Sequence, residues 1–291
     1  MKCSLCPRKC RVNRIDQLGA CGAGYQPRVA RAMLHLWEEP SISGTRGSGA
    51  VFFSGCNLGC IFCQNDALHD GTLGQEHTPE MLADLFLRLQ SQGAHNINLV
   101  TPTPHIHSLR RALLLAKKSG LIVPVIYNTG SYETKNALRA LDGLIDIYLP
   151  DLKYVSPILS RRFSNAEDYF CFASVAIMEM YRQVGDLQTD ASGMATRGLM
   201  IRHLVLPGCI DDSRKVLDHI VDNYPSSTHL SLMRQYTPTP RVTQPPLNRT
   251  LTVREYDRII SYALGIGLTN LLIQQKESAN LAYTPTFTDF Q

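Results

Sequence analysis

Runs of apolar residues, rich in β-branched side chains, recur along the chain after residue 50. Each run is almost continuously apolar, a pattern typical of parallel strands that are buried on both faces of a sheet. Seven strands are predicted in this way, at residues 50–54, 97–101, 122–128, 144–149, 199–206, 230–234 and 270–274.

The segments between these runs predict helices. In residues 77–93, Thr78 is a suitable N-cap, Pro79 suits the first turn, and Gly93 is a suitable terminator. Helical patterns also follow the second and third predicted strands, at residues 108–120 and 132–143. Strands that alternate with helices at this rhythm indicate βαβ units with parallel strands.

The fold class predicted from this pattern is α/β. Six or seven units favour a partial or complete TIM-like (β/α)6 barrel over an open doubly wound sheet. We expect a cysteine-rich extension at residues 1–48, followed by a barrel domain with C-terminal elements at 49–291. Two polar stretches, 184–198 and the proline-rich 237–250, are predicted as long loops. The second leaves the carboxyl end of a strand, where barrel enzymes build their active sites.

Composition narrows the class of protein. Of 291 residues, 44% are hydrophobic and 19% charged, which is enough for a large core. The net charge of +4 is not clustered, so we expect no nucleic-acid partner. No apolar run reaches membrane-spanning length and the N-terminus lacks the apolar region of a signal peptide, so we expect a cytoplasmic protein with no membrane contact.

Cysteines are concentrated near the N-terminus, with seven of the nine before residue 64. In a reducing compartment such clusters favour metal binding over disulfides. Cys3, Cys6, Cys10 and Cys21 make a four-thiolate set that would stabilise a segment too small for its own core. Their spacing does not choose between zinc and a second iron–sulfur cluster. The remaining two, Cys171 and Cys209, are predicted as core thiols.

Cys56, Cys60 and Cys63 follow the first predicted strand with the spacing C-x3-C-x2-C. Soft thiolates suit iron–sulfur chemistry, and three of them would leave one iron of a 4Fe–4S cubane free for another ligand. Two structural alternatives are a zinc site completed by His69 or His105, and simple burial of the thiols.

This spacing, with Phe62 before the last cysteine, resembles the radical S-adenosylmethionine (SAM) enzymes. The resemblance implies that the open iron of a 4Fe–4S cluster chelates the amino and carboxylate groups of SAM. It also implies one-electron cleavage of SAM and hydrogen abstraction by a 5′-deoxyadenosyl radical. The resemblance extends over nearly the whole chain and is closest to pyruvate formate-lyase activating enzyme-like proteins, a branch near the glycyl-radical activases.

The resemblance also suggests which strand ends bind SAM. After the second strand most relatives have a Gly-Gly-Glu stretch, where this chain has Thr101, Thr103 and His105. These are candidate SAM contacts, with the alternative that His105 only binds a loop carbonyl. The third strand end resembles the asparagine-bearing strand of the activases, which makes Asn128 and Thr129 candidates as well.

The fourth and fifth strands resemble the activases in their charged residues. Asp151 and Lys153 match an Asp-x-Lys signature and, being two apart on a strand, should share a face. Arg202 would be a fork for a carboxylate. His203, on the opposite side of that strand, is expected to be structural.

At the sixth strand end, Gln235 and Tyr236 stand where activases have a histidine. No catalytic residue is therefore assigned. The expected partners are a reductant such as flavodoxin or ferredoxin, and either a glycyl-radical enzyme or a small molecule or cofactor precursor as substrate. The alternative of another class is a non-catalytic metal-binding protein on a barrel scaffold.

Overall fold

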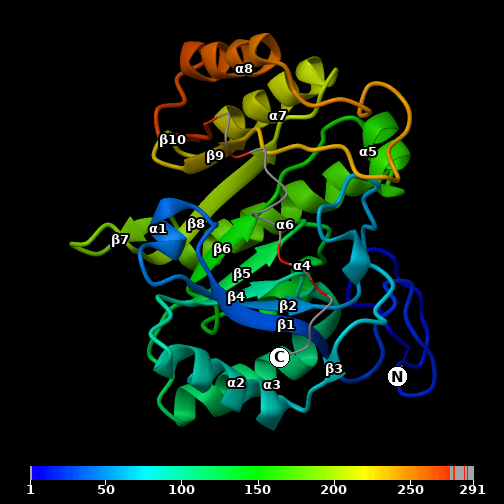
Figure 1. Ribbon diagram of the computed structural model, residues 1–291, viewed down its shortest axis with the longest axis vertical. Coiled ribbons are helices and arrows are strands. Elements are labelled where there is room, and N and C mark those ends of the chain that lie inside the picture. Colours follow the sequence, from blue (N-terminus) through cyan, green and yellow to red (C-terminus); the bar gives the residue numbers. More distant parts are fainter. Residues whose placement is uncertain (1, 276–277, 279–284, 286, 288–291) are drawn as a thin grey trace.

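The computed structural model describes residues 2–275, 278, 285 and 287. Its centre is one curved, mostly parallel sheet with the strand order β10-β9-β8-β6-β5-β4-β2-β1-β3 (Figure 1). The seven parallel members are β2 (Ser48–Phe53), β4 (Ile97–Val100), β5 (Val125–Thr129), β6 (Ile147–Pro150), β8 (Ala195–Leu204), β9 (His229–Met233) and β10 (Leu271–Ile273). All seven predicted strands are confirmed, and the fold is α/β, compatible with a partial TIM-like barrel.

Three further strands are antiparallel and were not predicted. β1 (Arg28–His35) pairs with β2, and β3 (Gln75–Glu76) extends the same edge. β7 (Gln188–Thr189) pairs with the start of β8. The segment 184–198, predicted as a loop, is therefore partly a hairpin, because Asp190 closes its turn by accepting hydrogen bonds from the backbone N–H groups of Ser192 and Met194. The predicted boundary at residue 48 stays a prediction, although β1 before it pairs with β2 after it.

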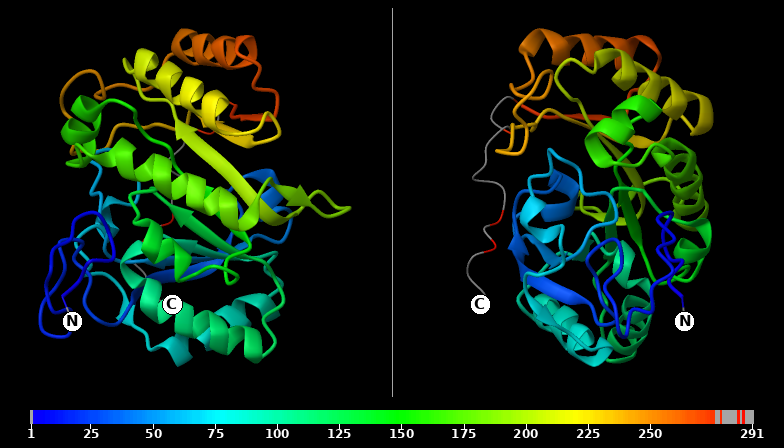
Figure 2. Two further views of the ribbon diagram at one scale, coloured as in Figure 1. Left: turned by 180° about the vertical axis from the view of Figure 1, so that it is seen from behind. Right: turned by 90° about the vertical axis from the view of Figure 1, so that its right-hand side faces the viewer.

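Helices cover the outer face of the sheet (Figure 2). The longer ones are α2 (Pro79–Ser91), α3 (Ile106–Lys118), α5 (Pro157–Ser164), α6 (Tyr169–Val184), α7 (Ile210–Asn223) and α8 (Val253–Gly265). Shorter elements are α1 (Pro40–Ser43), α4 (Lys135–Arg139) and the 3-10 turns η1 (Asp66–Leu68) and η2 (Thr103–His105). The predicted start of α2 is confirmed, since the Thr78 side chain accepts a hydrogen bond from the Met81 N–H.

Alternation along the strands assigns neighbouring residues to different apolar clusters. Val51, Leu99 and Tyr127 belong to the large core beneath the helices. Ile126, next to Tyr127, points the other way, into the barrel, and belongs to a cluster with Met200 and with Ile42 of α1. Phe52 and Val100, next to Val51 and Leu99, belong to a third cluster. The same alternation decides which polar residues near the strand ends face the barrel interior.

The two remaining cysteines, both predicted to be core thiols, differ in their burial. Cys209 is buried, as predicted, but Cys171 is exposed on α6, so its assignment as a core thiol was wrong. A hydrophobic stretch of sequence predicts burial of Cys171, and the helix instead turns this position outward.

Among the described residues, no helix is long and apolar enough to cross a membrane.

Candidate functional site

The three-cysteine loop begins where β2 ends. Gly55, which opens it, has a φ of 94°, and a side chain there would bring its Cβ within 2.8 Å of the Cys21 carbonyl oxygen. Glycine is required because both the left-handed backbone and the close approach exclude a Cβ. The loop is therefore in direct contact with the N-terminal extension.

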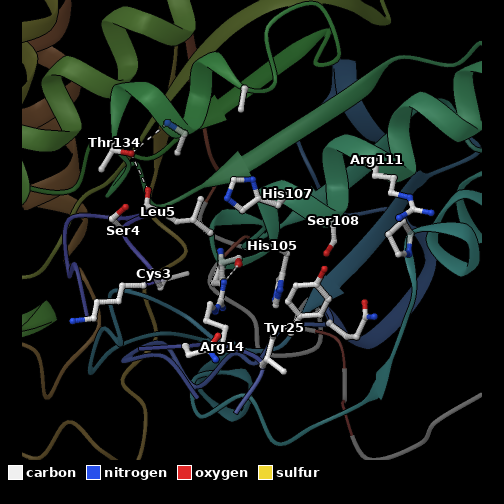
Figure 3. Close-up of a pocket in the computed structure, with 18 of the residues that line it drawn as sticks. Cys3, Ser4, Leu5, Arg14, Tyr25, His105, His107, Ser108, Arg111 and Thr134 are labelled. Carbon is white, nitrogen blue, oxygen red and sulfur yellow. Dashed lines mark hydrogen bonds between the residues drawn. The ribbon is translucent and has the colours of Figure 1, made fainter. Parts of the chain in front are cut away.

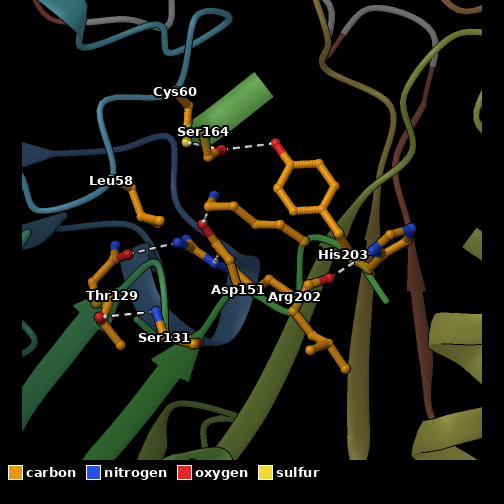
Figure 4. A network of polar contacts seen from close by, with 12 residues as sticks. Leu58, Cys60, Thr129, Ser131, Asp151, Ser164, Arg202 and His203 are labelled. Atoms are coloured by element: carbon orange, nitrogen blue, oxygen red, sulfur yellow. Dashed lines mark hydrogen bonds and ion pairs between the residues drawn. The ribbon is translucent and has the colours of Figure 1, made fainter. Parts of the chain in front are cut away.

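Hydrogen-bond donors point at the sulfur atoms of this loop. The Leu58 N–H lies 3.4 Å from the Cys56 Sγ, and the Ser164 hydroxyl lies 2.9 Å from the Cys60 Sγ. Figure 4 shows the second contact, in which Ser164 also meets a tyrosine hydroxyl. Burial raises the pKa of the Cys56 and Cys63 thiols, so a bound cation is needed to hold them as thiolates.

The donor set of this loop, three soft thiolates, suits an iron–sulfur cluster. A cubane takes each thiolate on a different iron, so its ligands stand farther apart than ligands around one ion. The His105 Nε2 lies 3.1 Å from the Ser54 carbonyl oxygen, so this ring nitrogen is bonded to the backbone before the loop.

Beside the loop, four predicted residues form one charged network (Figure 4). The Arg202 guanidinium donates to Asp151 at 2.9 Å and to the Asn128 side-chain oxygen at 2.5 Å. Lys153 donates to the other oxygen of Asp151 at 2.7 Å. The prediction that Asp151 and Lys153 share a face is confirmed by this contact.

Glu38 completes the network, and the sequence analysis missed it. Its carboxylate lies 3.3 Å from Arg202 and accepts hydrogen bonds from the side-chain amides of Asn98 and Asn128 at 3.1 and 3.3 Å. Its side chain is 12% exposed, in the segment between β1 and α1. The one available signal was the acidic pair Glu38-Glu39 directly after an apolar run.

The charges of the network reinforce one another. Burial alone would raise the pKa of Asp151, but Arg202 and Lys153 outweigh it and hold that pKa below its usual value. Burial opposes the charge on Lys153, yet the Asp151 carboxylate keeps the pKa of Lys153 above its usual value. Asp151 is therefore ionised at neutral pH and paired with two cations.

A cavity of about 210 Å³ joins the network to the three-cysteine loop. Its wall includes Cys63 and, of the predicted SAM contacts, Phe62, Asn128, Asp151, Lys153, Arg202, Gln235 and Tyr236. The end of β1 and the segment after it line the cavity as well, through His35, Trp37 and Glu38. One thiol, paired charges and aromatic rings from six parts of the chain thus meet at one place.

The other predicted contacts lie elsewhere. The hydroxyl groups of Thr103 and Thr129 donate to Glu133 at 2.6 and 2.8 Å, and Tyr127 donates to the same oxygen at 3.1 Å. Glu133 is 1% exposed, and burial raises its pKa although the hydroxyl groups lower it. None of these four residues lines the cavity of the charged network.

Thr101 and His105 are also outside the wall of that cavity. Thr101 has a φ of 59°, a conformation that β-branched residues rarely adopt. His105 is 3% exposed, and burial lowers its pKa to about 4, so it is neutral at pH 7. Its bond to the Ser54 carbonyl matches the structural alternative that the sequence had left open. His203, expected to be structural, is buried between the Leu152 carbonyl and the Ser213 hydroxyl.

The proline-rich segment 237–250 lies against the three-cysteine loop. The Thr239 hydroxyl donates to the Ile61 carbonyl at 3.0 Å, and the Gln64 amide donates to the Gln235 carbonyl at 3.1 Å. Tyr236 is anchored from the other side by its bond to the Leu247 carbonyl. This segment therefore covers one flank of the site.

The four N-terminal cysteines line one small cavity of about 10 Å³. The same cavity is lined by Asn57, the neighbour of Cys56. Arg8, between two of the cysteines, donates to the backbone carbonyls of Asn57 and Ser164 at 2.8 and 3.2 Å. The extension is thus bonded to both segments that surround the Cys60 sulfur.

Part of this site lies in a segment that is similar to a known protein family. The model of the radical SAM superfamily matches residues 50–185, which include the three-cysteine loop, Asn128, Asp151 and Lys153. Residues 50–185 are therefore similar to the radical SAM superfamily. The chain is also similar to an uncharacterized protein of Methanocaldococcus jannaschii, with 29% identity over 272 residues, or 90% of this chain and 74% of that protein.

Solved structures share the fold. SuiB of Streptococcus suis, in a structure with S-adenosylmethionine, superposes with a TM-score of 0.51 at 10% identity, over 77% of this chain and 49% of SuiB. Methylornithine synthase (PylB) has a TM-score of 0.51 at 15% identity, over 75% of this chain and 60% of that chain. The chain thus covers only about half of SuiB and three fifths of PylB. At these identities the likeness concerns the fold alone.

Proposed function

We propose that this chain is a radical SAM enzyme. The observation that carries the proposal is the convergence of the three-cysteine loop and the charged network on one cavity. When bound, a 4Fe–4S cluster at Cys56, Cys60 and Cys63 would supply the electron that cleaves SAM and releases a 5′-deoxyadenosyl radical. The remaining chemistry, which is binding, orientation and exclusion of water, belongs to the chain itself.

The charged network suits the polar end of SAM. Arg202 offers a planar fork to a carboxylate, while Asp151 and Glu38 offer oxygens to an amino group or a ribose hydroxyl. In the free protein both carboxylates are paired with Arg202. A ligand that carries a carboxylate and an amino group could replace these pairs, because its carboxylate would bind Arg202 while its amino group bound Asp151 or Glu38, so that no charged group would lose its partner. Phe62 and Tyr236, whose rings lie 6.2 Å apart, add an apolar wall.

Two substrate classes follow from the sequence. The activase-like resemblance favours the glycine of a glycyl-radical enzyme, which requires an open groove for a protein loop. A small molecule or cofactor precursor requires a covered site. The contacts of segment 237–250 with the three-cysteine loop and the cavity volume of about 210 Å³ favour a small-molecule substrate.

The second metal centre that we propose at the four N-terminal cysteines, zinc or iron–sulfur, would stabilise the three-cysteine loop beside it.

The proposal is tested with protein prepared without oxygen. We expect iron and sulfide at the stoichiometry of at least one 4Fe–4S cluster, and 5′-deoxyadenosine when SAM and dithionite are added. Cys60→Ala should lose that cluster and the product, whereas Cys171→Ala, at an exposed cysteine outside the site, should keep both. Zinc at both cysteine sets with no cleavage of SAM would favour the non-catalytic alternative and refute the proposal.

A further inference from the structure

A second and larger cavity lies outside the barrel, beneath the N-terminal extension. It has a volume of about 1010 Å³ and is bounded by the extension on one side and by the first turns of α2, α3 and α4 on the other. Figure 3 shows this groove, with Arg14 and Tyr25 on the side of the extension and His107, Ser108 and Arg111 on α3.

The groove is basic. Lys2, Lys9 and Arg14 line it from the extension, and Arg111 lines it from α3. The one acidic residue in its wall, Glu80, is already paired with Arg111 at 2.6 Å. The groove therefore has an excess of positive charge, although the charge of the whole chain is only +4.

Large apolar side chains are exposed in the same wall. Ile15 is 71% exposed and Tyr25 is 64% exposed, and both line the groove. Exposed aromatic and aliphatic groups beside arginine are typical of protein interfaces. A site for a small anion would instead enclose its ligand with buried polar groups. The pattern favours an acidic protein as the occupant.

The groove is also adjacent to the redox site of the proposed function. It shares Cys3, Leu5, Arg14 and Pro104 with the cavity of the four N-terminal cysteines. That cavity in turn reaches Asn57, next to Cys56. On its other side the groove is lined by His105, whose ring is bonded to the Ser54 carbonyl, two residues before Cys56. The groove is thus separated from the three-cysteine loop by the small cysteine-lined cavity on one side and by His105 on the other.

We propose that this groove is the docking site of an acidic electron-transfer protein, a small flavin or iron–sulfur protein. The proposal rests on the proposed function, which requires one electron from outside for each SAM cleaved. With a flavodoxin, the anionic hydroquinone would lose one electron to become the neutral semiquinone, and an oxidised 4Fe–4S cluster held by the three cysteines would gain that electron. Such encounters are small, weak and steered by charge, so a basic groove suits them.

The test compares two double variants of equal charge change. Lys9→Glu/Arg111→Glu reverses two charges of the groove. Lys215→Glu/Arg254→Glu reverses two exposed charges on α7 and α8, outside the groove. Each is measured in three ways at low and high ionic strength: binding of flavodoxin by calorimetry, 5′-deoxyadenosine formation with reduced flavodoxin, and the same reaction with dithionite. Iron, sulfide and zinc are determined for every sample.

The groove variant should bind flavodoxin at least about tenfold more weakly at low salt and lose rate with flavodoxin by a similar factor. Its dithionite rate and metal content should equal those of the parent, and the α7/α8 variant should match the parent throughout. The docking proposal fails if the parent does not bind flavodoxin at low salt, if both double variants lose binding equally, or if the groove variant loses its dithionite rate to the same extent. Groove-dependent binding without cleavage of SAM by any sample would uphold the docking site and refute the proposed enzyme.

Discussion

Asp151, whose side chain is 16% exposed, and Glu133, which is 1% exposed, follow the neighbouring strands β6 and β5, yet their surroundings differ. Asp151 is held by two cations, and its pKa is lowered. Glu133 is held by three hydroxyl groups, one of its oxygens has no partner among the described residues, and its pKa is raised. Only Asp151 lines the cavity beside the three-cysteine loop.

This difference distinguishes polar residues at strand ends that can bind a ligand from those that stabilise the fold. A paired ion in the wall of a cavity can exchange one partner for a ligand without losing its charge. A carboxyl group enclosed by hydroxyl groups instead ties together the segments that carry them, here strand β5 and the turn after β4. We therefore propose that the network of Asp151 binds SAM and that the network of Glu133 is structural, and three predictions test this division.

The largest effect is expected for Arg202→Leu. This change leaves Asp151 and Glu38 without their shared cation, and loss of one partner from a buried ion pair destabilises by about 3–5 kcal/mol. SAM binding should fall by more than about 100-fold, since a desolvated carboxylate contact of a ligand is lost as well. Calorimetry with SAM and chemical denaturation measure the two effects.

Arg161→Leu is the matched control for that change. Arg161 is also paired with a glutamate, Glu167, but its side chain is 66% exposed. Removal of this surface pair should change stability by less than about 1 kcal/mol and leave SAM binding as in the parent. Parental SAM affinity in Arg202→Leu would contradict the assignment of the network.

A smaller effect is expected for Glu133→Ala. Three buried hydroxyl groups lose their common acceptor, which should destabilise the chain by about 1–3 kcal/mol. Glu133→Gln keeps an acceptor oxygen and should retain most of the stability. SAM affinity of the folded variants should be unchanged, because Glu133 is not in the cavity wall. If Glu133→Ala weakens SAM binding as much as Arg202→Leu does, the two networks are not separate in function.

The smallest effect concerns pH. The folded pKa of Glu133 lies above its unfolded value near 4.5, so its contribution to stability is complete below that value and is lost as pH rises through the folded pKa. The folded pKa of Asp151 lies below its unfolded value near 3.8, so its contribution is present above that value and is lost as pH falls through the folded pKa. Glu133→Gln should therefore flatten the decline in stability above pH 4.5, and Asp151→Asn should flatten the decline on the acid side. Denaturation curves measured across this pH range give the free energy of unfolding as a function of pH. If Glu133→Gln leaves the slope of that function unchanged, the Glu133 carboxyl group is ionised in the folded protein.

Much of the candidate site could be predicted because strands have a period of two. The spacing of Asp151 and Lys153 places both on one face, and Arg202 reaches that face because Met200, two positions earlier, already points into the barrel. The same rule separates Asn128 from Thr129, which were both predicted to bind SAM. They are adjacent on β5, so only Asn128 points inward, and Thr129 turns to Glu133 beneath the helices.

The seven strands, the start of α2 and the three-cysteine loop follow from the sequence alone, because periodicity, capping and ligand spacing are local properties of the chain. Tertiary structure alone decided that Glu38 joins Arg202, 164 positions later, and that the extension and three helix starts form a basic groove. Contacts of this kind depend on which distant segments the curved sheet brings together, and the local sequence pattern does not specify them.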